Sequence, residues 1–501
     1  MFLGRRRLFL RQMSSCWKVD LGKYSGGKAG SRRQRLSRWI VSRSGLFDAN
    51  YYLQEYSDVA GVGMDPLFHY CQHGWRERRK PGPMAHPEYV YAGPIGRYFA
   101  RINPLVTWSL LGRWLGWSLA WPQLRTWKPP TGKLHGDLAI FVHEATRTGA
   151  PIFALRLARW MRRKRGVDPI LVVLDEGSLL PEMWNEFRCL PLFAVAEKAR
   201  PGLLQTALGE DCTIYLNSLA SLRAWAWLDW HKGALLLHAH ESAAGLKDYA
   251  PWLAAIAPSQ PRSIAVNESC RTPLAEMLGR EPDIIPPAID LSQARARSGV
   301  SLETRVIVGC GTMSRRKGAD LFCQVAAQVL ARFDGEVEFC WVGGEGDVDM
   351  RALLQQLGIA HKVRLAGEVP DPLQYLSAST LFLLPSRDDP FPLVALEAAS
   401  CGLPVLCFDA LADGVGAWVA QGAGQMVQAF DVAAMAAAVI DFLESPDSCA
   451  TAGAVARNIS ARFDIEQVGE EIYNIIDEVV AEKYNIDEEE FDNNPSFEVA
   501  I

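Results

Sequence analysis

The sequence predicts an α/β protein with two doubly wound, Rossmann-like domains that face a cleft, preceded by a mostly helical region. Short runs of Val, Ile and Leu alternate with helical patterns, and this alternation occurs in two series. Continuous apolar strands separated by helices are typical of parallel sheets that are covered on both faces. A chain of 501 residues is also too long for a single hydrophobic core.

Strand-like runs define the two series. The first series comprises residues 138–143, 170–174, 213–216, 235–240, 264–266 and 284–285. The second comprises residues 306–309, 337–342, 363–365, 381–384 and 404–408. We therefore expect an accessory region at 1–130, a first domain at 135–288, a second at 289–465, an amphipathic helix at 466–484 and a disordered acidic tail at 485–501. Ligands of such sheets bind beyond the carboxyl ends of the strands, which predicts a cleft between the domains.

Composition narrows the class of protein. Apolar residues make up 49% of the chain and charged residues 22%, which indicates a globular protein. The net charge of −5 does not point to nucleic acid as a partner. Eleven scattered cysteines without a paired spacing predict free thiols in a reducing cytoplasm.

The two ends carry opposite charge. Residues 1–43 are strongly basic, and the chain from Glu482 onward is acidic. A Trp-rich stretch at 102–124 has Arg113 at its centre, which argues against a membrane-spanning helix. Two interpretations of this stretch stay open: an interfacial helix at a membrane surface, and a helix packed on the protein body. For the tail we favour solvated residues.

The segment 386–408 combines a loop, a helix and a strand. We expect Asp388 or Asp389 as the N-cap, Pro390 or Pro392 in the first turn, and Gly402 as the stop. The helix start offers free N–H groups and the positive end of the helix dipole to an anion. Glu397 follows Pro390 by almost two turns, so it faces the same side and can accept ribose hydroxyls.

This segment resembles the E-x7-E element of retaining GT-B glycosyltransferases of family four. Asp389 replaces the first Glu and keeps its charge with a shorter reach, while Glu397 matches the second. The alternative interpretation is an ordinary capped helix with a surface Glu.

A second element follows the strand at 306–309. Arg315, Arg316 and Lys317 offer positive charge to a diphosphate, and Gly311 and Gly318 permit close approach of the backbone. It resembles the phosphate-binding turn of the same family, with Lys317 as the matched lysine. Thr312 stands where many members have an Arg, and a basic solvated loop is the alternative interpretation.

Further segments match the family less specifically, but they occur in the family's order relative to Lys317 and Glu397. Gly344 follows the next strand, and residues 363–369 resemble the family's segment beside the nucleobase. In the first domain, Gly149, Ala150 and Pro151 resemble the family's glycine loop. His240 with Glu241 resembles the His-containing turn at the catalytic centre, although His238 and His240 could also be core residues or metal ligands.

The resemblance implies a sugar nucleotide as co-substrate, retention of anomeric configuration and no metal or other cofactor. It implies catalytic roles for His240, Lys317 and Asp389. The residues implied in donor binding are Gly149, Ala150, Gly311, Arg316, Lys317, Gly344, Pro390, Phe391, Pro392, Leu393 and Glu397. We interpret the DxD-like pair Asp347 and Asp349 as helix capping rather than as a metal motif.

The N-terminal region resembles a short module found beside bacterial polysaccharide glycosyltransferases. The match is carried by Phe47, Asp48, Tyr51, Tyr52, Asp58, Val59, Pro66, His69, Tyr70 and Gly74. The resemblance implies transfer to a surface polysaccharide or a lipid-linked glycan. With the basic arm, residues 1–130 suggest contact with an anionic membrane surface, hence a peripheral location on the inner face of the plasma membrane. A catalytically weakened scaffold and a sugar-nucleotide epimerase are the alternative functions.

Overall fold

A computed structural model describes residues 32–42, 47, 49–77, 79–81, 103–107, 109, 127–293, 305–369 and 371–484. The chain forms two compact units that divide between Lys128 and Pro129. The basic residues 1–31, Asp48, the tryptophans of the Trp-rich stretch and the acidic tail lie outside the described residues. Within the described part, no helix is long and apolar enough to cross a membrane.

The first unit is helical where it is described, as the sequence predicts. Its elements are α2 (Arg32–Ser42), α3 (Ala49–Glu55), α4 (Ser57–Gly61), α5 (Pro66–His69), the π-helix η2 (Tyr70–Gly74) and α8 (Pro104–Thr107). The Tyr52 hydroxyl lies 3.0 Å from Nδ1 of His69, and a Cβ on Gly74 would collide with that hydroxyl. Several residues that carry the module's match therefore pack against one another in one small core.

The first sheet of the second unit has seven parallel strands in the order β3-β2-β1-β4-β5-β6-β7. Their bounds are β1 (Leu138–Val142), β2 (Ile170–Val173), β3 (Cys189–Pro191), β4 (Thr213–Asn217), β5 (Leu235–Ala239), β6 (Arg262–Ala265) and β7 (Asp283–Ile284). The helices around it are α10 (Gly149–Arg165), α11 (Leu180–Glu186), α12 (Arg200–Leu208), α13 (Ala250–Ile256) and α14 (Glu268–Leu278).

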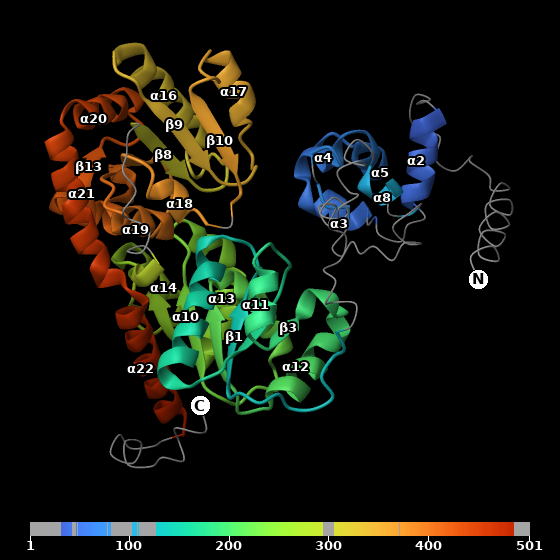
Figure 1. Cartoon of the computed structure of the whole chain (residues 1–501). Coiled ribbons are helices and arrows are strands. Elements are labelled where there is room, and N and C mark those ends of the chain that lie inside the picture. The colour runs from blue at the N-terminus through green and yellow to red at the C-terminus, as the bar shows by residue number, and fades with distance from the viewer. Residues whose placement is uncertain are drawn as a thin grey trace, which may run out of the picture. The chain divides into compact units, whose positions relative to one another are not determined.

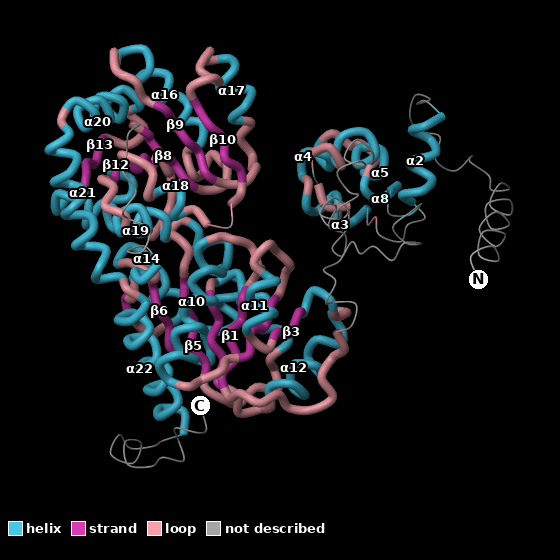
Figure 2. Tube along the Cα trace, in the orientation of Figure 1, coloured by secondary structure: helices cyan, strands magenta, loops and turns pink. Residues whose placement is uncertain are grey.

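The second sheet has six parallel strands in the order β10-β9-β8-β11-β12-β13. Their bounds are β8 (Val306–Cys310), β9 (Glu338–Val342), β10 (Val363–Gly367), β11 (Leu381–Leu384), β12 (Val405–Phe408) and β13 (Gly424–Val427). Its helices are α16 (Ala319–Arg332), α17 (Met350–Gln356), α18 (Leu373–Leu376), α19 (Leu393–Ser400), α20 (Val432–Glu444) and α21 (Pro446–Ser460). Figure 2 shows the two groups of strands as separate sheets, each flanked by helices. Both strand orders are doubly wound, which confirms the predicted fold class.

Two edge strands are missing from the sequence prediction, for physical reasons. Strand β3 has only three residues and ends at Pro191, so it is too short for an apolar run. Strand β13 begins at Gly424, whose φ is +156°, and its next residue is Gln425. Edge strands have one free side and need fewer apolar residues than the central strands do.

Helix α22 (Ile465–Tyr484) confirms the predicted C-terminal helix. It leaves the second sheet and runs along the first (Figure 1). Glu466 pairs with Arg163 and Lys164, and Arg262 pairs with Glu478. At the crossing, Ile289 and Asp464 form a parallel bridge, so both chain connections between the sheets lie side by side.

We predict that Gly469→Ala destabilises the second unit. A Cβ on Gly469 in α22 would lie 2.5–2.9 Å from the indole of Trp160 on α10, which is 1% exposed. Overpacking of this kind costs about 1–3 kcal/mol. Gly202→Ala in α12 is the matched control, because its Cβ would meet no atom within 4 Å. Both variants gain the same helix propensity, so Gly469→Ala should melt at a lower temperature than Gly202→Ala. Equal melting temperatures would contradict the assigned packing.

Candidate functional site

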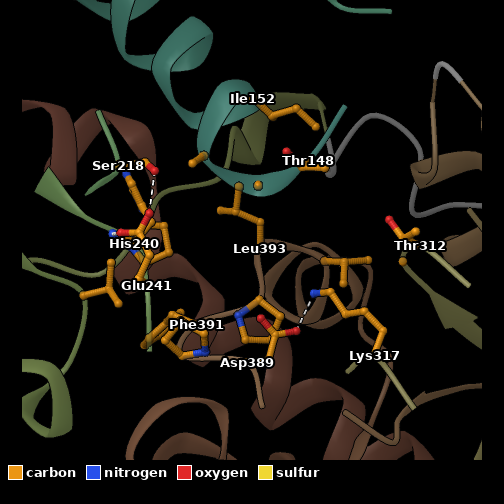
Figure 3. Close-up of a pocket in the computed structure, with 18 of the residues that line it drawn as sticks. Thr148, Ile152, Ser218, His240, Glu241, Thr312, Lys317, Asp389, Phe391 and Leu393 are labelled. Atoms are coloured by element: carbon orange, nitrogen blue, oxygen red, sulfur yellow. Dashed lines mark hydrogen bonds and ion pairs between the residues drawn. The ribbon is translucent and has the colours of Figure 1, made fainter. Parts of the chain in front are cut away.

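A cavity of about 390 Å³ lies between the carboxyl-end edges of the two sheets. It receives residues from both sheets, and Figure 3 shows Thr148, Ser218 and His240 on one wall and Lys317 and Asp389 on the other. The sequence-predicted residues that line it are Gly149, Ala150, His240, Gly311, Arg316, Lys317, Asp389, Pro390, Phe391, Pro392, Leu393 and Glu397. Gly344 is not among the lining residues; its carbonyl instead accepts from the N–H of Met313 at 2.9 Å.

The turn after β8 is built on glycines. Gly318 has a φ of +70°, and a Cβ there would collide with the carbonyl of Pro385 at the end of β11. Gly311 has a φ of +145°, and its carbonyl accepts from Nε1 of Trp341 at 2.9 Å. These close approaches fix the position of Lys317 relative to the loop that follows β11.

Lys317 forms an ion pair with the carboxylate of Asp389, which is only 7% exposed. Arg316 lies at the rim: its Nη1 donates to the carbonyl of Asp388 at 2.9 Å and stands 3.7 Å from Oδ1 of Asp389. The hydroxyl of Ser386 is 3.4 Å from Oδ2 of Asp389. Asp389 therefore holds the lysine in place at the cavity wall, and two cations share one buried carboxylate.

Helix α19 begins later than the sequence predicts. Helix α19 has Pro392 as its N-cap, without a side-chain cap hydrogen bond, so the expected capping by Asp388 or Asp389 is wrong. Phe391 precedes Pro392, and a residue before proline is driven out of the helical region, so the helix cannot start before Pro392. The end is as predicted: Gly402 has a φ of +80°, and its N–H donates to Ala399 at 2.8 Å.

Glu397 lies on the cavity side of α19 but is not alone there. Its carboxylate is paired with the guanidinium of Arg156, which belongs to α10 on the opposite wall. The side chains of Glu397 and Arg156 are 11% and 14% exposed, and Arg156 also reaches the carbonyl of Ala288 at 3.4 Å. Sequence reasoning missed Arg156, because its partner lies 241 residues away.

The first domain forms one side of the cavity, which we call the first wall. The start of α10 belongs to it. Gly149 is the first residue of α10, and a Cβ on it would lie 3.8 Å from Cδ1 of Leu393 on the facing helix. Asn267 bridges the walls by donating to the carbonyl of Pro390 at 2.9 Å, and the hydroxyl of Ser242 donates to Asp388 at 2.7 Å. Side chains of the first domain therefore contact the 388–393 segment of the second domain directly.

His240 follows β5 and contacts Asn217 at the end of β4, with 3.0 Å between Nε2 and Oδ1. Burial, together with the nearby His143, lowers the pKa of His240 to about 3. Its ring stacks on that of His238 at 4.1 Å, and the latter points to the hydroxyl of Tyr215 inside the sheet. The described residues contain no cluster of three or more potential metal ligands.

Glu241 belongs to the predicted His-containing turn, but the sequence assigns it no role of its own; in the structure it lines the cavity next to His240. Its carboxylate accepts from the Ser218 hydroxyl, from the N–H of Leu219 at 3.1 Å and from the N–H of His240 at 2.9 Å. It therefore shapes the turn that carries His240. His143 and Tyr249 also line the cavity and likewise come from segments that follow strands.

Both carboxylates of the DxD-like pair accept backbone N–H groups, but only Asp349 caps a helix. Asp349 is the N-cap of α17 and accepts from the N–H of Ala352 at 3.0 Å. Asp347 accepts from the N–H of Arg315 at 2.9 Å. The interpretation as helix capping is therefore confirmed for Asp349, whereas Asp347 supports the turn that carries Lys317.

Comparison with known proteins matches residues 304–445 to the family model "Glycosyl transferases group 1". D-inositol 3-phosphate glycosyltransferase 1 of Catenulispora acidiphila is 34% identical over 169 residues, which are 31% of this chain and 40% of that protein. The D-inositol 3-phosphate glycosyltransferase of Acidothermus cellulolyticus is 30% identical over 235 residues, 42% of this chain and 51% of that protein. The chain thus spans about half the length, or less, of these curated relatives.

Solved structures share the fold at low sequence identity. Anabaena HepE, solved with UDP and glucose, superposes with a TM-score of 0.58 at 18% identity and covers 69% of this chain and 100% of its own. Sucrose-phosphate synthase of Thermosynechococcus elongatus gives 0.55 at 19% identity, with 69% and 100% covered. WaaG, a glycosyltransferase involved in lipopolysaccharide biosynthesis, gives 0.54 at 16% identity, with 68% and 99% covered. The chain therefore has a GT-B fold and carries a glycosyltransferase group 1 domain.

Proposed function

We propose that this protein transfers a sugar from a nucleotide-sugar donor to a glycan acceptor, with retention of anomeric configuration. The observation that carries the proposal is the cavity itself. It places Lys317 and Glu397 on one wall opposite Gly149 and His240 on the other. The group 1 family match over 304–445 covers the wall that would hold the nucleotide.

The cavity offers a separate place for each part of the donor. The diphosphate would lie against Lys317, Arg316 and the uncapped start of α19, where positive charge gathers. The ribose would lie at Glu397, because Arg156 donates to Oε1 of that carboxylate and no described residue donates to Oε2. A carboxylate accepts up to about four hydrogen bonds, so a second oxygen stays free for hydroxyls.

The transferred sugar would lie between Asp389 and the turn at His240. By resemblance to retaining enzymes of this fold, the leaving phosphate would take the proton of the acceptor hydroxyl on the same face of the sugar. The C1–O bond to the diphosphate breaks and a C1–O bond to the acceptor forms. The protein's part is to stabilise the charge that develops on the diphosphate, which Lys317 and Arg316 are placed to do.

The choice of donor and acceptor to test follows from the comparisons. HepE has been solved with UDP-glucose, so UDP-sugars are the first donors to try. The curated relatives are named for D-inositol 3-phosphate, so this compound is the acceptor to compare with oligosaccharides. We favour a surface polysaccharide or lipid-linked glycan because of the N-terminal module, and a membrane-peripheral location goes with that acceptor.

A nucleotide-sugar panel tests the proposal. The full chain is incubated with each donor, with and without acceptor, and release of nucleoside diphosphate is followed; the anomeric configuration of the product is read by NMR. An α-linked product from an α-linked donor supports retention. Binding without hydrolysis or transfer would point to a scaffold, and an epimerised sugar would point to an epimerase. No binding of any donor would overturn the proposal.

We predict that Lys317→Ala lowers kcat by about 10²–10³-fold, which is the usual loss for one stabilising donor at a developing oxyanion. The matched control is Lys362→Ala on the same domain, because Lys362 does not line the cavity. Initial rates at saturating donor measure the effect. Similar rates for the two variants would remove Lys317 from the catalytic machinery.

We predict that Arg156→Ala weakens binding of the nucleotide sugar by about tenfold, roughly 1.4 kcal/mol. Without Arg156 the buried carboxylate of Glu397 loses its counter-charge and its fixed orientation. Arg159→Ala is the control on the same helix, since Arg159 pairs with Glu182 and Glu186 instead. Calorimetric titration of both variants measures the difference; tighter binding by Arg156→Ala would mean that the arginine competes with the ribose.

We predict that transfer does not require a divalent cation. The carboxylates of Asp347 and Asp349 accept backbone N–H groups, and Lys317 and Arg316 already supply positive charge at the proposed diphosphate position. Activity should therefore persist after treatment with EDTA and dialysis. A loss of activity that Mg²⁺ or Mn²⁺ restores would contradict this expectation.

A further inference from the structure

We propose that Asn217 is a positioning residue that fixes the tautomer of His240 and ties this histidine to the glycine turn at 149–150. This proposal has a structural part and a catalytic part. The structural part concerns hydrogen bonds of Asn217 that exist without substrate. The catalytic part rests on the proposed function, because it assumes that His240 faces the transferred sugar.

Asn217 lies between the two turns of the first wall. It is the last residue of β4, is 0% exposed, and pairs in register with Val142 of β1 and His238 of β5. Its amide Nδ2 donates to the carbonyl of Ala150 at 2.9 Å. Its Oδ1 lies 3.0 Å from Nε2 of His240. One side chain therefore contacts both segments that approach the cavity from the first domain.

These two contacts determine where the proton on His240 lies. A backbone carbonyl only accepts hydrogen bonds, so the NH₂ group of Asn217 must face Ala150 and its oxygen must face His240. An amide oxygen also only accepts, so Nε2 of His240 must carry the hydrogen. The Ala150 carbonyl and the Asn217 amide together therefore fix the Nε2-protonated tautomer of His240.

The other ring nitrogen of His240 is left for a ligand. Within the described residues, Nδ1 makes no hydrogen bond and is not fully buried. His240 itself lines the cavity. The titratable groups around the ring are His143, the stacked His238, and Glu241, which binds the backbone N–H of His240. Because the pKa of His240 is lowered to about 3 by burial and His143, the ring is neutral near pH 7. A neutral ring with the proton on Nε2 presents Nδ1 as a hydrogen-bond acceptor, which suits a sugar hydroxyl.

The same amide couples His240 to the start of α10. Ala150 follows Gly149, and Gly149 lies opposite Leu393 on the other wall. Loss of the amide would release the histidine and the turn together, so donor geometry should suffer more than donor affinity. A misplacement of about 1 Å at a reacting centre costs on the order of 10²-fold in rate.

The neighbouring pair of residues provides a matched control. Tyr215 lies two residues earlier on β4, and its hydroxyl contacts Nδ1 of His238. His238 is 0% exposed and is not among the cavity-lining residues. Tyr215→Phe therefore removes a buried histidine contact between the same two strands without touching His240.

The experiment combines nitrogen NMR with kinetics on the full chain. Histidine is labelled with ¹⁵N, and the His240 signals are assigned by their loss in His240→Gln. The expected wild-type pattern is a protonated Nε2 and a bare Nδ1 from pH 6 to pH 8. The opposite tautomer, or a mixture, overturns the structural part whether or not the protein transfers sugar.

Asn217→Asp and Asn217→Ala test the catalytic part. Both should lower kcat by about 10–100-fold with a smaller change in KM, while Tyr215→Phe should leave kcat within about twofold. Asn217→Asp places a carboxylate at Nε2 and raises the pKa of His240, because a nearby negative charge favours the charged ring. Protonation removes the acceptor at Nδ1, so this variant alone should lose activity as the pH falls from about 7 to 5. If wild type transfers sugar and Asn217→Asp shows the wild-type pH profile and kcat, the positioning role is overturned.

Discussion

The return of α22 to the first sheet is the constraint on which the site depends. The chain leaves the first domain near Ile289 and comes back near Asp464, and these two residues bridge each other. Beyond this point, Glu466 and Glu470 pair with Arg163 and Arg165 of α10. Helix α10 starts at the glycine turn and carries Arg156, so α22 also holds this wall of the cavity in position.

Ion pairs supply the electrostatic balance of the cavity. Lys317 is matched with Asp389 within the second domain, and Glu397 is matched with Arg156 across the cleft. A buried charge without a partner is costly, so each cation keeps a carboxylate when no anionic ligand is present. In the proposed reaction, a diphosphate would share Lys317 with Asp389 rather than meet an isolated ammonium group. Asp389 therefore positions Lys317 directly, in addition to the place beside the transferred sugar that we propose for it.

Much of the fold follows from local sequence. The central strands are continuous apolar runs because both faces of a parallel sheet are covered, and this pattern gives β1, β2, β4, β5, β8, β9 and β11. The periodicity of α22 and the stop at Gly402 are also local properties. The start of α19 differs from the sequence prediction, because Pro392 keeps Phe391 out of the helical region whatever the capping preference of Asp389. The edge strands were missed because they carry little apolar surface.

The sequence by itself determined the types of residue that line the cleft between the two domains and the strand ends at which they occur. It could do so because the ends of parallel strands meet at one edge, which makes the order of the motifs equivalent to their proximity. Only the tertiary structure decided the partners of these residues. The pairing of Arg156 with Glu397 and the bridge from Ala150 through Asn217 to His240 join segments from 23 to 241 residues apart. No local pattern specifies such contacts. The bridge through Asn217 depends on which strands lie side by side in the first sheet, and the Arg156–Glu397 pair depends on how the two sheets are brought together.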